Sequence, residues 1–125
     1  MTYGLIVGNR GFFPDHLAKT GREEMLAVLK KAGHCVIAPG LEDTKHGAIE
    51  TREEAKKCAA LFRANRDKID GVIVTLPNFG DEKAIAETMR LSGLNSPVLV
   101  HAFPDTRGQM TIADRRDSFL FTWIV

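Results

Sequence analysis

Four short apolar runs recur along the chain, spaced by roughly 30 residues, which is the size of one strand–helix unit. Each run is continuous rather than alternating and is rich in Val and Ile. This pattern is typical of strands that are buried on both faces of a parallel sheet. We therefore predict four buried parallel strands, with the sequences YGLIV at 3–7, CVIA at 35–38, GVIV at 71–74 and PVLV at 97–100.

Amphipathic segments separate these runs. Residues 17–32, 51–69 and 81–92 carry apolar side chains at helical spacing, with charged side chains between them. Thr51 and Glu54 form a capping-box signature at the start of the second segment. Strands that alternate with helices fold into an open parallel sheet with helices on both faces. The pattern predicts an α/β fold, a flavodoxin-like three-layer sandwich with a parallel sheet of four or five strands.

The chain ends on a further apolar run, SFLFTWIV at 118–125. Its aromatic and β-branched residues favour a strand, and this run would supply the fifth strand of the sheet if there is one. Left exposed, it would be an aggregation-prone edge. We therefore expect residues 120–125 to pair as a short strand, either in this sheet or across a dimer interface.

Composition limits the classes of function. The chain has 125 residues, the length of one domain (1–125), and 17 basic against 16 acidic residues give a net charge of +1. This balance argues against nucleic acid and anionic membranes as partners, and no apolar run is long enough to span a membrane. Cys35 and Cys58 lie in apolar surroundings and are expected to be buried free thiols. Because no signal-peptide pattern is present, we expect a cytoplasmic location.

Ligands of open parallel sheets bind beyond the carboxyl ends of the strands, so the loops there form the candidate site. In GNRGFFPDH (8–16), Arg10 could hold a phosphate or sugar hydroxyls. Alternatively, Arg10 is solvated at the tip of a turn. In TLPNFGDE (75–82), the ring of Phe79 beside the amide of Asn78 suits a sugar ring. A loop Phe can equally pack as a lid over the sheet edge.

Other polar residues near this edge have simpler explanations. Asp81 is best explained as a helix N-cap, with Glu82 favourable beside the helix dipole. His101, directly after the fourth run, could act as an acid, a base or a ligand, but a hydrogen-bonded structural histidine is the simpler interpretation. The run DRRD at 114–117 is expected to be a solvated face or a subunit contact.

Three classes of function are compatible with an open parallel sheet of this kind: a substrate-contacting domain of a larger enzyme, a stand-alone domain that binds a small ligand such as a sugar or flavin, and a receiver-like signalling domain. A receiver needs acidic residues after the first and third strands, where this sequence has GNRG and TLPN, so we set that class aside. A flavin site would favour a hydroxyl-rich phosphate loop, which GNRGFF lacks. The residues alone leave the first two classes open.

Four motifs in order, GNRGFFP, LPNFGDE, HAFPD and DRRDSF, resemble the N-terminal region of the L-fucose/L-arabinose isomerase family, which includes the L-fucose isomerase-like proteins. The resemblance covers residues 3 to 119. It implies the flavodoxin-like first domain of a cytoplasmic, three-domain aldose–ketose isomerase that assembles as a homo-oligomer. It also implies that Arg10, Asn78 and Phe79 bind the sugar, in a pocket shared with other domains or subunits.

The resemblance assigns the catalytic chemistry to other domains. The divalent manganese and the two carboxylates that transfer the proton through an enediol belong to later domains, so no cofactor, metal ligand or catalytic residue is expected in this chain. After DRRDSF the family continues with a glycine-containing polar turn, where this sequence has LFTWIV. We therefore expect an isolated or truncated N-terminal domain that does not isomerise sugars alone. The alternative is a stand-alone flavodoxin-like domain that binds a sugar or flavin.

Overall fold

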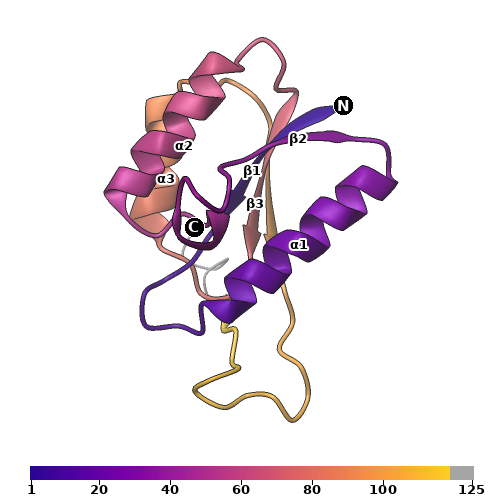
Figure 1. Ribbon diagram of the computed structural model, residues 1–125, viewed down its shortest axis with the longest axis vertical. Helices are drawn as coiled ribbons and strands as arrows, with labels where there is room; N and C mark the ends of the chain where they lie inside the picture. The colour runs from indigo at the N-terminus through magenta and orange to yellow at the C-terminus, as the bar shows by residue number, and fades with distance from the viewer. Residues whose placement is uncertain (119–125) are drawn as a thin grey trace.

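The computed structural model describes residues 1–118 of the chain. Within these residues, four strands alternate with three α-helices, and one short 3₁₀-helix lies between β2 and α2 (Figure 1). In chain order the elements are β1 (Thr2–Val7), α1 (His16–Lys31), β2 (Cys35–Ile37), η1 (Lys45–Gly47), α2 (Arg52–Ala64), β3 (Gly71–Leu76), α3 (Glu82–Ser92) and β4 (Val98–Ala102).

The four strands form one parallel sheet in the order β2-β1-β3-β4, which matches the first four strands of a flavodoxin-like sheet. α1 lies against one face, and α2 and α3 cover the other (Figure 1). Side chains of β1 alternate between the faces: Leu5 and Val7 pack on the α1 side, whereas Ile6 packs with α2 and α3. This arrangement confirms the predicted α/β sandwich. The predicted strand at 120–125 lies outside the described residues.

Both predicted helix caps are present. Thr51 Oγ1 accepts a hydrogen bond from the Glu54 N–H (3.2 Å), and the Glu54 carboxylate accepts one from the Thr51 N–H (3.1 Å), which completes the capping box of α2. Asp81 Oδ1 accepts a hydrogen bond from the Ala84 N–H at the start of α3 (2.9 Å). The caps fix where these helices begin, and therefore where the preceding loops end.

Two predictions of burial are wrong, both at edges of the sheet. Val98, Leu99 and Val100 of β4 are 46%, 60% and 37% exposed, because among the described residues β4 has a neighbouring strand on one side only. Cys35 is exposed because it begins the opposite edge strand, which has three residues. Cys58 is buried as predicted, which raises the pKa of its thiol to about 12. Both cysteines are free.

Candidate functional site

Two buried asparagines join the loops that follow β1 and β3. Asn78 Nδ2 donates a hydrogen bond to Asn9 Oδ1, and Asn9 Nδ2 donates one to Glu50 Oε2 (3.0 Å). Both asparagine side chains are almost fully buried. Because β1 and β3 are neighbours in the sheet, their carboxyl ends bring these loops together at the predicted edge.

Asn78 is held from several sides. Its amide nitrogen also donates to the Pro14 carbonyl (3.3 Å), and its oxygen accepts from the Gly80 N–H (3.2 Å). The side chain is 0% exposed. Asn78 therefore lies beneath the edge and fixes the shape of both loops, whereas Arg10 and Phe79 are partly exposed.

The Arg10 side chain has defined partners. Its Nη2 atom lies 3.0 Å from Glu82 Oε2, in an ion pair whose side chains are 26% and 37% exposed. Its guanidinium carbon lies 5.0 Å from the centre of the Phe79 ring and 5.7 Å from that of Phe12, within the range of cation–π attraction. Arg10 is therefore not simply solvated at the tip of a turn, as the alternative interpretation had it.

Three aromatic rings, Phe12, Phe13 and Phe79, form what we call the aromatic ledge beside Arg10. Phe13 stacks on Phe79 with ring centres 5.4 Å apart and 14° between the planes, and Phe12 lies 5.0 Å from Phe13. Phe12 is exposed, whereas Phe79 packs partly against the core. The ledge offers apolar surface next to guanidinium donors and a carboxylate acceptor. A sugar ring has matching C–H groups and hydroxyls, which both donate and accept hydrogen bonds.

The DRRD run contacts the same edge. Arg116 Nη1 donates to the Pro77 carbonyl (3.0 Å), and its guanidinium carbon lies 4.9 Å from the centre of the Phe103 ring. The guanidinium carbon of Arg115 lies 5.5 Å from the Phe13 ring of the ledge. The expectation of a solvated face is therefore wrong for Arg116. These contacts are non-local and leave no pattern along the chain, so the sequence does not predict them.

His101 has a structural partner. Its Nδ1 atom lies 3.0 Å from Thr75 Oγ1 across the β3–β4 pair, and Thr75 is fully buried. The imidazole also meets the Phe103 ring edge-on, with 4.9 Å between centres. These contacts support the interpretation of His101 as a hydrogen-bonded structural histidine.

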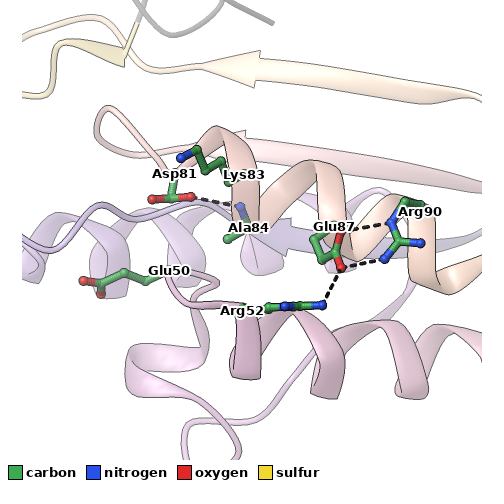
Figure 2. Close-up of a pocket in the computed structure, with 7 residues that line it drawn as sticks. All are labelled: Glu50, Arg52, Asp81, Lys83, Ala84, Glu87 and Arg90. Carbon is green, nitrogen blue, oxygen red and sulfur yellow. Dashed lines mark hydrogen bonds and ion pairs between the residues drawn. The ribbon is translucent and has the colours of Figure 1, made fainter.

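A charged cleft of about 560 Å³ adjoins this edge, between the start of α2 and the side of α3 from Asp81 to Arg90 (Figure 2). Glu50, which binds Asn9, lines it on one side, and Asp81, which precedes Glu82, lines it on the other. The cleft therefore lies next to the Arg10–Glu82 pair: Glu50 bonds to Asn9, which precedes Arg10, and Asp81 precedes Glu82. The complete lining consists of Glu50, Arg52, Asp81, Lys83, Ala84, Glu87 and Arg90.

An ionic network occupies the end of the cleft away from Glu50 and Asp81 (Figure 2). Arg90 donates two hydrogen bonds to the Glu87 carboxylate (2.7 and 3.0 Å), which lower the pKa of that carboxyl group. Arg52 Nη2 lies 3.7 Å from the same carboxylate. Three of the six charged residues that line the cleft, Arg52, Glu87 and Arg90, are therefore paired with one another.

Residues 1–118 contain neither a metal-binding cluster of side chains nor a membrane-spanning helix. In this part of the chain, no three His, Cys, Asp or Glu side chains lie together in a group that could hold a metal ion. No helix described here is long and apolar enough to cross a membrane.

A known family accounts for most of the chain. The family model of the fucose/sulfoquinovose isomerase N-terminal domain matches residues 4–120. The chain belongs to this family. The match confirms the resemblance predicted from the four loop motifs. Searches of curated proteins and of solved structures found no significant match.

In this isomerase N-terminal domain, the structure brings Arg10 and Phe79 into contact and places Asn78 beneath them. The sequence places Glu82 at the start of a helix but does not predict its ion pair with Arg10. The available signal is topological: Glu82 follows the strand next to β1, so it lies at the same edge as Arg10.

Proposed function

We propose that this domain contacts the sugar in an aldose–ketose isomerase of the L-fucose/L-arabinose type, through Arg10 and Phe79. The observation that carries the proposal is the guanidinium of Arg10, which lies 5.0 Å from the centre of the Phe79 ring at the carboxyl edge of the sheet. Ligands of such sheets bind at this edge, and the family match supports a role in an isomerase.

The residues of the edge divide the work of binding. The Phe79 ring offers apolar contact to the C–H groups on one face of a sugar. Arg10 carries five N–H donors, and its hydrogen bond to Glu82 uses one nitrogen, Nη2, so donors remain for sugar hydroxyls. We assign Asn78 a positioning role, because its buried amide fixes the loops that carry Arg10 and Phe79.

We assign the chemical step to other domains of the assembled enzyme. Isomerisation moves a proton between adjacent carbons through an enediol. The family resemblance implies that a divalent manganese bound by later domains supports this chemistry. The present domain would hold one side of the sugar in a reactive orientation. We further propose a cytoplasmic homo-oligomer in which other domains or a neighbouring subunit complete the pocket.

Binding by the chain alone tests the sugar-contacting role. We expect L-fucose to shift the backbone amide signals of Gly11 and Phe79 in ¹H–¹⁵N NMR spectra, which can be followed in every variant. Arg10→Ala should weaken binding about tenfold, because a hydrogen bond to a charged group contributes about 1.5–3 kcal/mol. Arg66→Ala is the matched control, since Arg66 is exposed and precedes β3, at the opposite edge of the sheet. Equal affinities of the two variants would exclude Arg10 as a sugar contact.

Activity of the chain alone tests the assignment of catalysis to other domains. We expect no conversion of L-fucose to its ketose by the 125-residue chain with added Mn²⁺. Measurable turnover would contradict this assignment. Micromolar binding of FMN, with its visible absorbance retained by the protein, would instead favour a stand-alone flavin-binding domain.

A further inference from the structure

We propose that Glu82 sets the charge selectivity of the Arg10 site, so that the site favours neutral sugars over sugars that carry a sulfonate or phosphate group. This inference rests on the proposed sugar-contacting role of Arg10. It addresses a choice that the family match leaves open, because the family description includes a neutral sugar, fucose, and an anionic sugar, sulfoquinovose.

The position of Glu82 is fixed by the fold. Glu82 is the first residue of α3, and the Asp81 cap holds the start of that helix through the Ala84 N–H (2.9 Å). From there the Glu82 carboxylate meets Arg10 Nη2 at 3.0 Å. Both side chains are partly exposed, so a ligand that reaches Arg10 also lies close to Glu82.

The pair carries no net charge, and this decides which ligands it suits. An arginine that binds sulfonate or phosphate uses its guanidinium fork against the anion. Here a carboxylate already occupies one nitrogen, so its repulsion offsets the attraction of Arg10 for a second anion. A hydroxyl group both donates and accepts hydrogen bonds, so a neutral sugar can bond to Arg10 and Glu82 together.

The second arginine at the aromatic ledge is neutralised in the same way. Arg115 lies over the Phe13 ring, and its Nε atom is 3.3 Å from Asp117 Oδ2. Asp117 has a positive φ of 49°, which is uncommon for residues other than Gly. Among the described residues, both arginines whose guanidinium groups lie over rings of the ledge therefore have a carboxylate partner.

A matched pair of sugars tests the proposal. Quinovose and sulfoquinovose differ by the sulfonate on C6, and each is titrated against the 125-residue chain while the Arg10 Nε–H signal is followed by NMR. We expect quinovose to bind about tenfold more tightly than sulfoquinovose. Glu82→Gln removes the repelling charge and should strengthen sulfoquinovose binding about tenfold, so that the preference for quinovose is lost.

Glu23→Gln is the control for a general change in charge, because Glu23 is an exposed residue of α1. It should leave the preference between the two sugars unchanged. The role of Glu82 is overturned if the unchanged chain binds both sugars equally, if Glu82→Gln keeps the original preference, or if Glu23→Gln alters it as much as Glu82→Gln does.

Inorganic sulfate separates this inference from the proposed sugar-contacting role. If no sugar shifts the Arg10 signal, the sugar-contacting role fails, but sulfate still reports on Glu82. We expect sulfate to shift the Arg10 signal of Glu82→Gln at concentrations about tenfold lower than for the unchanged chain. Equal responses to sulfate would overturn the role of Glu82 whatever the sugars do.

Discussion

At the scale of single residues, a series of buried side-chain hydrogen bonds, rather than the exposed charges, fixes the shape of the carboxyl edge of the sheet. Asn78 bonds to Asn9, and Asn9 bonds to Glu50, so three loops are held through side chains. Buried amides of this kind are costly to leave without partners. The shape of the ledge therefore depends on groups that a ligand never touches.

Asn78→Ala should lower the free energy of unfolding by about 2–3 kcal/mol, because it leaves Asn9 Oδ1 and the Gly80 N–H without their buried partner. Urea unfolding measures the change. Asn95→Ala, at an exposed position before β4, should change the free energy by less than about 0.5 kcal/mol. A loss below 1 kcal/mol for Asn78→Ala would contradict the structural role of this amide.

Sequence patterns reveal single residues only in part. Arg10 and Phe79 stand out because a loop cation and a loop aromatic follow buried strands. The burial of Asn78 and the pairing of Glu82 depend on which loops meet, and the sheet order decides this. Polar residues in a loop have the same appearance in a sequence whether they face solvent or close a buried network.

At the scale of elements, the helices and strands follow from local signals. Thr51, Glu54 and Asp81 cap the helices where the sequence predicts. Local signals do not show which strands are central. The apolar runs of β3 and β4 are alike in sequence, yet β3 is fully buried and β4 is largely exposed. Burial of a strand depends on its neighbours, and residue periodicity does not report them.

Thr51→Ala tests the capping box of α2. Loss of the hydroxyl that accepts the Glu54 N–H should lower the free energy of unfolding by about 1 kcal/mol. Thermal or urea unfolding measures it, with Thr106→Ala in an exposed turn as the control. A Thr51→Ala variant as stable as its control would show that Glu54 alone is sufficient to begin the helix.

The link between the first loop and η1 should respond to pH. Lys45 Nζ lies 2.9 Å from Asp15 Oδ2, and this hydrogen bond lowers the pKa of the Asp15 carboxyl group below 3.8. The stabilisation is therefore present above pH 3.8 and is lost as the pH falls through the lowered pKa. We expect Lys45→Gln to raise the pKa of Asp15, as measured by NMR titration of its carboxyl carbon. An unchanged pKa of Asp15 in this variant would show that Lys45 does not cause the lowering.

At the scale of the whole molecule, helices cover both faces of the sheet, and within residues 1–118 the longer of its two edge strands, β4, is exposed. β4 presents Val98, Leu99 and Val100 to solvent, with no Lys on the strand to discourage pairing. An exposed apolar edge of this kind is a surface on which further chains can pair.

Leu99→Lys should reduce concentration-dependent self-association of the chain, because a charge on an edge strand opposes pairing. Analytical ultracentrifugation over a range of concentrations measures this effect. Val28→Lys adds the same charge at an exposed position of α1 and should leave association unchanged. If both variants associate to the same extent as the unchanged chain, β4 is not the contact.

Because the two cysteines differ in burial, their rates of alkylation can report how often the core of the molecule opens. Thiols react as thiolates, so an alkylating reagent at neutral pH labels exposed Cys35 in the folded chain. Cys58, buried on α2 with its pKa raised to about 12, reacts only when α2 separates from the sheet. Its labelling rate therefore reports how often the core opens under native conditions. Mass spectrometry would separate chains labelled at Cys35 alone from chains labelled at both cysteines. The second species would measure opening of the core without any added denaturant.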